Sequence, residues 1–266
     1  MTMNTICKRE YWDKIDLHIH SNYSDSSRSI EEIVDIALSK GLSAISISDH
    51  DTVKQCLKAQ EFKDKIRIIN GIEISAFDSS INKEVHILGY DFDLPANNIV
   101  SICENTIKLK DENCLWQISR LNELGYEIDE SKVRKFQRNS ECLYKQHILN
   151  ALFEEGLITD IFDDFYHEVY RKELKKKFEL PSVEDVINAI HKDNGKVFIA
   201  HPFLSGIQDS LEKYIALGID GIEVKHSKAN EKEVEYLYEL SIKNNLLMSK
   251  GSDNHGIYGT ESEIGS

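Results

Sequence analysis

The stretch Ile15-Asp16-Leu17-His18-Ile19-His20-Ser21-Asn22-Tyr23-Ser24-Asp25 decides how the rest of the chain is interpreted. Apolar and polar residues alternate over its first half, which predicts a short β-strand. Side chains two positions apart on a strand share one face, so His18 and His20 are expected to point the same way. Two such imidazoles at a strand end can form half of a metal site. Asp25 follows in a polar loop that can fold back over them.

The composition limits the class of protein. The chain has 266 residues, a formal net charge of −14 and a pI near 5.2. This charge argues against a basic groove for nucleic acid, although bound metal ions would bring their own positive charge to a pocket. The cysteines are scattered without a Cys-x-x-Cys pair, which favours reduced thiols and a cytoplasmic location. Neither an apolar leader nor an apolar run of membrane-spanning length is found, so no membrane is expected as a partner.

Two regions of alternating strand and helix patterns flank a helical middle. The alternation runs from residue 15 to 90 and resumes after Pro181. Repeats of this length predict a parallel sheet and, in one domain, a barrel. The expected organisation is an α/β barrel domain formed by residues 1–94 and 181–266, with residues 95–180 as a helical insertion or lid.

Several helix ends carry capping signals. Ser29 and Glu32 form a capping-box pattern, which predicts a helix that begins after Ser29. Gly41 is expected to end this helix, because glycine adopts the left-handed conformation at low cost. Gly125 and Gly156 are expected to end helices of the middle region in the same way.

Residues of the types that bind metal ions gather at the ends of the predicted strands. Barrel enzymes build their sites at the carboxyl ends of parallel strands, because the loops there converge on one mouth. Imidazole and carboxylate ligands suit zinc, iron or manganese, and no cysteine stands among them, which argues against a structural thiolate site. The residues at these positions are His18, His20, His50, Glu73, His86, His201, His226, Asp253 and His255.

Taken in order, these residues resemble the motifs of the PHP (polymerase and histidinol phosphatase) family of metal-dependent phosphoesterases, in particular its nucleotide- and RNA-directed branch. The resemblance covers most of the chain on both sides of the insertion. It implies a distorted seven-stranded, TIM-like (β/α) barrel with a trinuclear metal site. The motifs that carry it are His18-x-His20, Asp25, Asp49-His50-Asp51, Gly71-Ile72-Glu73-Ile74-Ser75, His86, Ala200-His201-Pro202 and Gly251-Ser252-Asp253-x-His255.

Carried over residue by residue, the resemblance implies three ions of zinc, manganese or iron. The first ion would be bound by His18, His20, Glu73 and Asp253. The second would share Glu73 as a bridge and take His86 and His201. The third would be bound by Asp25, His50 and His255. Among these ligands, the resemblance gives catalytic roles to Glu73, Asp253 and His255.

The implied reaction is hydrolysis of phosphate monoesters or diesters by a metal-bridged hydroxide. Metal ions neutralise the phosphoryl oxygens and lower the pKa of a bridging water. The implied substrates are small phosphorylated compounds, namely nucleotides such as 3′,5′-bisphosphonucleotides, or short RNA 5′ ends. No obligate protein partner is evident from the sequence.

The residues that contact phosphate outside the metals depart from the family pattern. The family has an Arg-x-His pattern in the insertion, whereas this chain has Lys145-Gln146-His147. Lysine neutralises a phosphate but lacks the bidentate fork of arginine. We expect Lys145, His147 and His226 to bind substrate, brought together as a lid closes. Asp16 and Asp49 are expected to orient ligand histidines, as metal-bound imidazoles usually require.

Two other functions compete with this interpretation. The first is a metal hydrolase of the amidohydrolase type, which also opens with His-x-His in a barrel. That class often bridges its metals with a modified lysine, whereas this chain offers Glu73. The second is a non-catalytic, metal-binding regulatory module. Its expected mark is a missing ligand, and the ligand set of this chain is complete.

Overall fold

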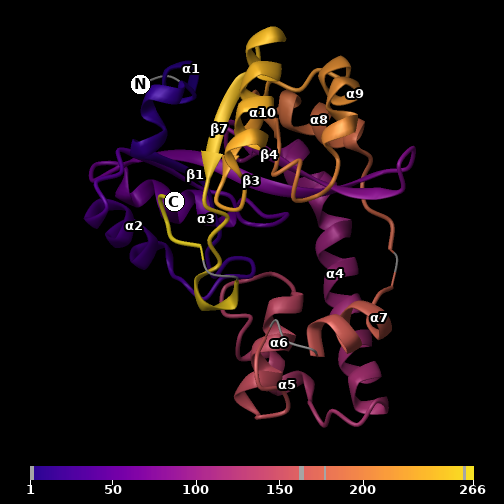
Figure 1. Cartoon of the computed structure of the whole chain (residues 1–266). Helices are drawn as coiled ribbons and strands as arrows, with labels where there is room; N and C mark the ends of the chain where they lie inside the picture. Colours follow the sequence, from indigo (N-terminus) through magenta and orange to yellow (C-terminus); the bar gives the residue numbers. More distant parts are fainter. Residues whose placement is uncertain (1–2, 162–164, 177, 260–261) are drawn as a thin grey trace.

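The computed structural model describes residues 3–161, 165–176, 178–259 and 262–266, apart from the side chains of Asn4 and Ile6. Its strands form one seven-stranded sheet in the order of the sequence, and the sheet curves into a nearly closed barrel (Figure 1). The strands are β1 (Ile15–Ile19), β2 (Ala44–Ile47), β3 (Arg67–Asp78), β4 (Lys83–Tyr90), β5 (Lys196–Ile199), β6 (Gly221–His226) and β7 (Leu247–Gly251).

The sheet is mixed, so the prediction of an entirely parallel sheet was wrong for one strand. β1, β2 and β3 pair in parallel, as do β5, β6 and β7. β4 runs antiparallel to both β3 and β5. The cause is the short connection over residues 79–82, because a parallel pairing needs a crossover of a dozen or more residues.

Hydrogen bonds between the chain beyond β7 and the end of β1 join the two edges of the sheet at the mouth of the barrel. The Asp253 amide donates to the His18 carbonyl (2.7 Å), and the His20 amide donates to the Asn254 carbonyl (3.0 Å). Gly251 permits this approach, since a Cβ atom there would lie 2.2 Å from the His18 Cβ. The pairing places Asp253 beside the two histidines of β1.

Helices cover the outside of the barrel, so the strands are buried on both faces. The capping box predicted at Ser29 is present, with Glu32 as its partner, and Gly41 follows the helix with φ +71°. The helices of this part are α1 (Met3–Ile6), α2 (Ile30–Ser39), α3 (Lys54–Ala59), α8 (Val183–Lys192), α9 (Leu211–Ala216) and α10 (Glu231–Lys243). Short 3₁₀ turns are η1 (Arg9–Lys14), η2 (Gln60–Phe62), η4 (Gln208–Ser210) and η5 (Gly256–Tyr258).

The middle of the chain forms a second helical body. α4 runs from the barrel into this body (Figure 1), which packs around an apolar cluster that includes Leu121, Val133 and Leu149. Gly125 and Gly156 adopt left-handed conformations after α4 and α6, as predicted. Of the predicted insertion, residues 162–164 and 177 lie outside the described part. Its elements are α4 (Asn97–Glu123), α5 (Glu130–Arg134), α6 (Lys145–Glu154), the π-helical turn η3 (Phe165–Tyr170) and α7 (Arg171–Glu173).

None of the helices described for this chain combines the length and the apolar character needed to cross a membrane.

Candidate metal centre

The candidate ligands from both halves of the barrel converge at its mouth. Their donor atoms form overlapping groups in which all atoms lie within 4.8 Å of one another. Three such groups occur among the described residues: His18, His20, Glu73 and Asp253; His20, Asp25, His50 and His255; and His50, Glu73 and His86. His201 joins through its Nε2 atom, 3.1 Å from Glu73 Oε1.

Glu73 lies at the centre of the cluster. Its Oε2 atom is 3.2 Å from His18 Nε2, from His20 Nε2 and from His50 Nδ1. Its Oε1 atom is 2.8 Å from His86 Nδ1 and 3.1 Å from His201 Nε2. One buried carboxylate therefore connects all the groups, an arrangement compatible with the bridging role expected for it.

Two of these residues reach the mouth differently from the prediction. Glu73 lies in the middle of the long strand β3, and His86 lies in the first half of β4. Because β4 is antiparallel to its neighbours, the half that contains His86 faces the same mouth as the carboxyl ends of the parallel strands. The reversal of β4 therefore delivers His86 to the site.

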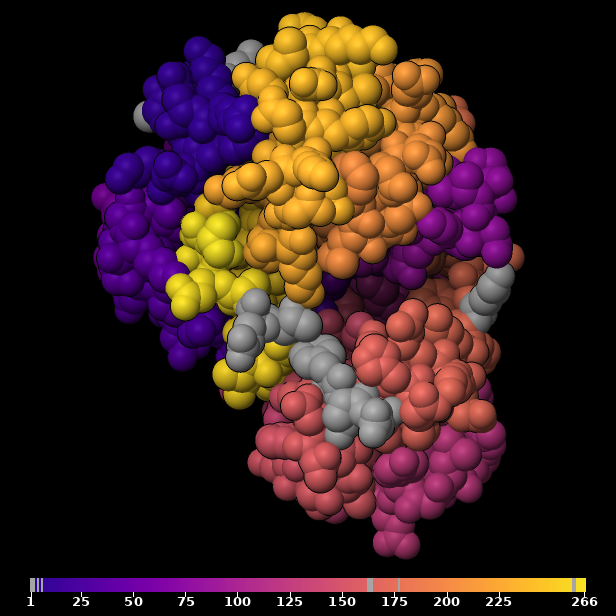
Figure 2. Space-filling model, viewed as in Figure 1, coloured from indigo at the N-terminus to yellow at the C-terminus, as the bar shows by residue number. Residues whose placement is uncertain are grey.

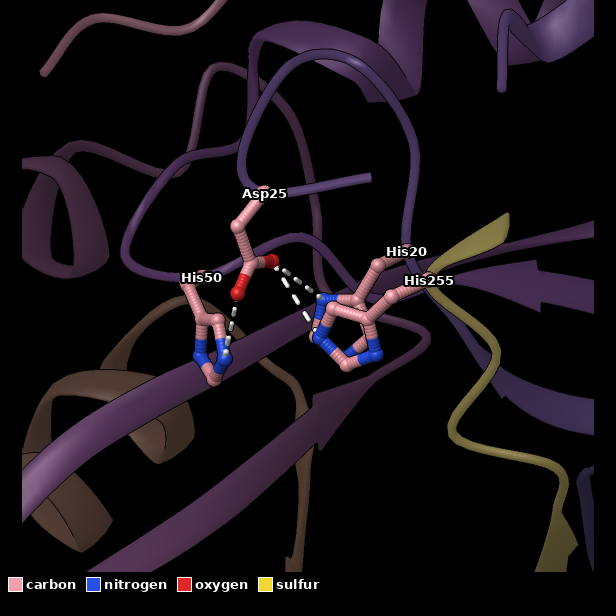
Figure 3. Close-up of side chains that lie close together, drawn as sticks. All are labelled: His20, Asp25, His50 and His255. Atoms are coloured by element: carbon pink, nitrogen blue, oxygen red, sulfur yellow. Dashed lines mark ion pairs between the residues drawn. The ribbon is translucent and has the colours of Figure 1, made fainter. Parts of the chain in front are cut away.

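Asp25 lies between the imidazoles of the group in Figure 3. Its carboxylate oxygens are 3.3 Å from His255 Nε2, 3.7 Å from His20 Nδ1 and 3.8 Å from His50 Nε2. The His20 and His255 rings are stacked, with centroids 4.0 Å apart. The expected set of Asp25, His50 and His255 is thus brought together, with His20 beside it.

Several buried nitrogen and oxygen atoms of the candidate ligands have no hydrogen-bond partner, although the nitrogens lie close to a carboxylate. Polar atoms left unpaired in a protein interior cost free energy, and cations between them would remove this cost. The residues present therefore fit metal ions, and their buried clusters are consistent with a multi-metal site. The atoms are His18 Nε2, His20 Nδ1 and Nε2, His50 Nδ1, Glu73 Oε2 and His255 Nε2.

The electrostatics of the cluster also favour bound cations. Burial alone would raise the pKa of Glu73, but the surrounding imidazoles, His50 foremost, hold it well below its usual value. Burial would lower the pKa of His20, yet the Asp253 and Glu73 carboxylates raise it to about 10. Carboxylates that hold protons on imidazoles so strongly also attract divalent cations, which compete with protons for these ligands.

Glu223 is a supporting residue that the sequence analysis did not identify. Its Oε1 atom is 3.0 Å from His18 Nδ1, and its Oε2 atom accepts a hydrogen bond from the His201 amide (2.7 Å). A carboxylate in this position fixes the ring orientation of a metal-binding histidine. The signal in the sequence is an acidic residue between the apolar residues Ile222 and Val224 of β6.

Asp16 and Asp49 do not perform the orienting role expected of them. Asp49 accepts hydrogen bonds from the Ser21 amide and from the Ser21 and Ser24 hydroxyls. Asp16 accepts from the Ser252 and Gly265 amides. Both carboxylates therefore hold the backbone of ligand-bearing segments in place, and the ring of His18 is oriented by Glu223 instead.

The three residues expected to bind phosphate do not line a common cavity. His226 lines a cavity of about 180 Å³ beside His201. Lys145 lines another, of about 270 Å³, with His50, His86 and Lys110. The two cavities border different sides of the cluster, and Figure 2 shows a hollow between the barrel and the helical body.

His147 lies at neither cavity. Its ring is buried, and its Nδ1 atom accepts a hydrogen bond from the Tyr144 amide (3.1 Å) at the beginning of α6. Burial lowers the pKa of His147 to about 4, so the ring is neutral near pH 7. This position differs from the phosphate contact expected from the sequence, because the side chain already serves as a helix cap.

His226 is oriented as a hydrogen-bond donor toward the cluster. Its Nδ1 atom accepts from the Lys228 amide (3.2 Å), so the neutral ring carries its proton on Nε2. Nε2 lies 3.4 Å from Asp253 Oδ2. The N–H group of His226 therefore faces the edge of the candidate metal site.

Comparison with known proteins agrees with this geometry. The sequence profile of the PHP domain matches residues 16–217. The chain belongs to the PHP family. It is accordingly a phosphoesterase, and the non-catalytic interpretation and the amidohydrolase interpretation are set aside.

Two named relatives of this PHP-family chain align with more than nine-tenths of it. The phosphoribosyl 1,2-cyclic phosphate 1,2-diphosphodiesterase of Eggerthella lenta is 30% identical over 94% of this chain and 97% of its own length. The 3′,5′-nucleoside bisphosphate phosphatase of Chromobacterium violaceum is 25% identical over 91% of this chain and 90% of its own. A solved structure from Bifidobacterium adolescentis, proposed to be a metal-dependent phosphoesterase, superposes with a TM-score of 0.85 at 26% identity, covering 94% of this chain and 90% of its own.

Proposed function

We propose that this protein hydrolyses a phosphate ester on a ribose that carries a second phosphate group, using up to three divalent or iron ions. The observation that carries the proposal is the Glu73 carboxylate, which has five imidazole nitrogens within 3.2 Å. A buried carboxylate shared by several imidazole ligands is the kind of bridge that a multinuclear hydrolase needs. We assign the bound ions to zinc, manganese or iron, which suit imidazole and carboxylate donors.

The names of the relatives support the choice of substrate class. One acts on phosphoribosyl 1,2-cyclic phosphate, and another acts on 3′,5′-nucleoside bisphosphates. A third, from Escherichia coli, is a 5′-3′ exoribonuclease that is 24% identical over 90% of this chain. These substrates share a ribose unit with phosphate groups at two positions. We extend that shared chemistry, and no single compound, to this protein.

Residues of the chain would have separate roles in catalysis. When bound, the ions neutralise phosphoryl oxygens and lower the pKa of water near them. Glu73 joins the ligand groups, and Glu223 holds the His18 ring in the orientation that points Nε2 into the site. His226 presents an N–H group at the edge of the cluster, where it can donate to a phosphoryl oxygen.

Lys145 is proposed to bind the second, non-reacting phosphate. It lines the cavity that also contains the edges of His50 and His86, so a phosphate there would lie beside the ligand cluster. Its Nζ atom lies over the Tyr166 ring, 5.5 Å from the centroid. A single ammonium group can neutralise a phosphate without the geometric selectivity of arginine.

The proposal can be tested with the full chain, reconstituted anaerobically with Fe²⁺, Mn²⁺ or Zn²⁺. The expected result is metal-dependent hydrolysis of a 3′,5′-bisphosphonucleotide or of phosphoribosyl 1,2-cyclic phosphate, with the products measured by chromatography. Activity on a nucleoside 5′-monophosphate should be weaker. Glu73→Gln should lower both metal content and turnover about 100-fold or more, because the amide cannot supply the bridging charge.

Glu61→Gln is the matched control, since Glu61 is exposed and remote from the barrel mouth. It should behave like the wild type. A wild-type protein that binds metal but cleaves none of these esters would contradict the proposal. Full metal content and turnover in Glu73→Gln would show that the bridge is elsewhere.

A further inference from the structure

We infer that the insertion, residues 95–180, positions one group of metal ligands: Asp25, His50 and His255. The inference rests on the proposed metal site and extends it. It concerns the three loops that carry these residues, all of which the insertion contacts. Loop ligands need such support, because a binding constellation must be held in place by packing and hydrogen bonds around it.

The loop of His50 has the most extensive contacts with the insertion. The Tyr144 hydroxyl donates to the His50 carbonyl (2.8 Å), and the Tyr144 ring is stacked on the His50 imidazole with centroids 5.9 Å apart. Lys110, on α4, forms an ion pair with Asp51 (2.6 Å). The ligand is therefore held by its backbone, by its ring and through the next residue.

The Lys110 ion pair extends to the neighbouring strand. Its Nζ atom also donates to the Ser75 hydroxyl (2.8 Å), and Asp51 Oδ1 accepts from the Ser75 amide (2.9 Å). The Lys110 side chain is only 14% exposed and Asp51 is fully covered. A buried charge without its partner is strongly unfavourable, so this ion pair constrains both elements.

The loop of Asp25 is held at both ends. The Asn139 amide donates to the Asn22 carbonyl (3.1 Å), and Asn139 Nδ2 donates to Asn22 Oδ1 (3.2 Å). On the other side, Arg138 Nη1 donates to the Ser27 carbonyl (2.6 Å). Two consecutive residues of the insertion thus bracket the loop whose middle carries Asp25.

The segment after His255 packs against the insertion through Tyr258. This ring is 2% exposed and lies edge to face with Phe136 (5.8 Å) and with His147 (6.1 Å). The buried position of His147, which the sequence did not predict, is explained by this packing. The insertion therefore reaches all three loops of the group.

The other side of the cluster is supported by the barrel itself. His18 is oriented by Glu223 on β6, and Asp253 is fixed by the hydrogen bond from its amide to the His18 carbonyl. Weakening the insertion contacts should therefore affect the ion at Asp25, His50 and His255 and leave the ion at His18 and Asp253 in place.

The experiment is a titration of the metal-free full chain with Mn²⁺, in which calorimetry measures each binding event. Elemental analysis after desalting then counts the ions that stay bound. Tyr144→Phe keeps the stacked ring and removes the hydrogen bond to His50, and Lys110→Met removes the ion pair with Asp51. Each should weaken one binding event about 10- to 100-fold, the usual effect of losing support around a ligand, and leave the other binding events unchanged. Lys110→Arg should restore much of the loss.

The controls are Lys108→Met, an exposed lysine on the same helix, and Tyr236→Phe, an exposed tyrosine on α10. If Tyr144→Phe and Lys110→Met bind Mn²⁺ as the wild type does, the inference is overturned while the proposed metal site stands. An equal weakening of every binding event would also overturn it. If the wild type binds no metal, the proposed function itself fails, and this outcome is distinct from the first two.

Discussion

A single carboxylate organises the site at the scale of residues. Glu73 is fully buried, and its two oxygens face imidazoles from β1, from β4 and from the loops after β2 and β5. Without cations, this arrangement is stable only if some imidazoles are protonated. The same attraction that raises the pKa of His86 to about 10, against the effect of burial, would hold a metal ion there.

Lys145 offers a test of substrate specificity at this scale. Lys145→Met should raise KM for a 3′,5′-bisphosphonucleotide about 10- to 100-fold, as expected for one charge-assisted hydrogen bond to phosphate. The kcat value should stay near that of the wild type, because the contact is made equally in the ground state and in the transition state. Steady-state kinetics on a substrate with one phosphate should be unaffected.

Lys108→Met again serves as the control, and Lys145→Arg should preserve or improve binding through its fork. An equal loss on both substrates would contradict this specificity role and place Lys145 at the reacting phosphate.

At the scale of elements, the antiparallel strand β4 is the feature that departs most from a regular barrel. It returns directly from β3, and its first half carries His86 to the mouth. The hairpin is tied to α9 through Asp78, which accepts hydrogen bonds from Lys213 Nζ (2.7 Å) and from the Tyr214 hydroxyl (2.8 Å). This contact fixes the end of the two long strands.

Asp78 therefore supports a prediction about stability. Burial opposes its charge, but the hydrogen bonds from Lys213, Ser80 and Tyr214 lower the pKa of Asp78 to about 2. Its usual value is 3.8, so the lowered pKa stabilises the folded protein above pH 4. The contribution is lost as the pH falls through about 2, because the unfolded chain binds the proton first.

Urea unfolding of Asp78→Asn at pH 7 should show this loss, and the difference from the wild type should shrink as the pH approaches 2. Asp64→Asn, at an exposed position, should change neither the free energy of unfolding at pH 7 nor its dependence on pH. A constant difference between pH 7 and pH 3 would mean that Asp78 acts through packing instead of charge.

At the scale of the whole molecule, an acidic chain concentrates its histidines in one place. The formal net charge is −14, yet the cluster at the mouth joins imidazoles from five strands or their following loops. Metal ions that bind the folded protein alone should stabilise it by mass action. Each ion at 100 times its Kd would contribute about 2.7 kcal/mol.

Calorimetry should therefore show a Tm that rises by roughly 5–10 °C for each ion bound when Mn²⁺ is added to the chelated protein at this excess, since 1 kcal/mol corresponds to about 2–4 °C for a chain of this size. Glu73→Gln should show a much smaller rise. An unchanged Tm in the wild type would argue against tight binding at the cluster.

The sequence by itself determined the helical middle, the capping of α2 by Ser29 and Glu32, and the identities of the residues that meet at the mouth. These features are readable because they depend on local periodicity, on capping chemistry and on residue types that have few other uses. The strand-helix repeats predicted a barrel, and the resemblance carried by the ordered motifs added its seven-stranded form and the family, which were confirmed.

The tertiary structure alone decided the reversal of β4, the role of Glu223 and the contacts between the insertion and the loops of the ligand cluster. Each depends on pairs of residues far apart in the chain, such as His18 with Glu223 or His50 with Tyr144. Local patterns do not specify which distant partner a buried carboxylate or tyrosine will meet. The strand pairing and the packing of the insertion settle that choice, because they determine which groups share a space closed to water.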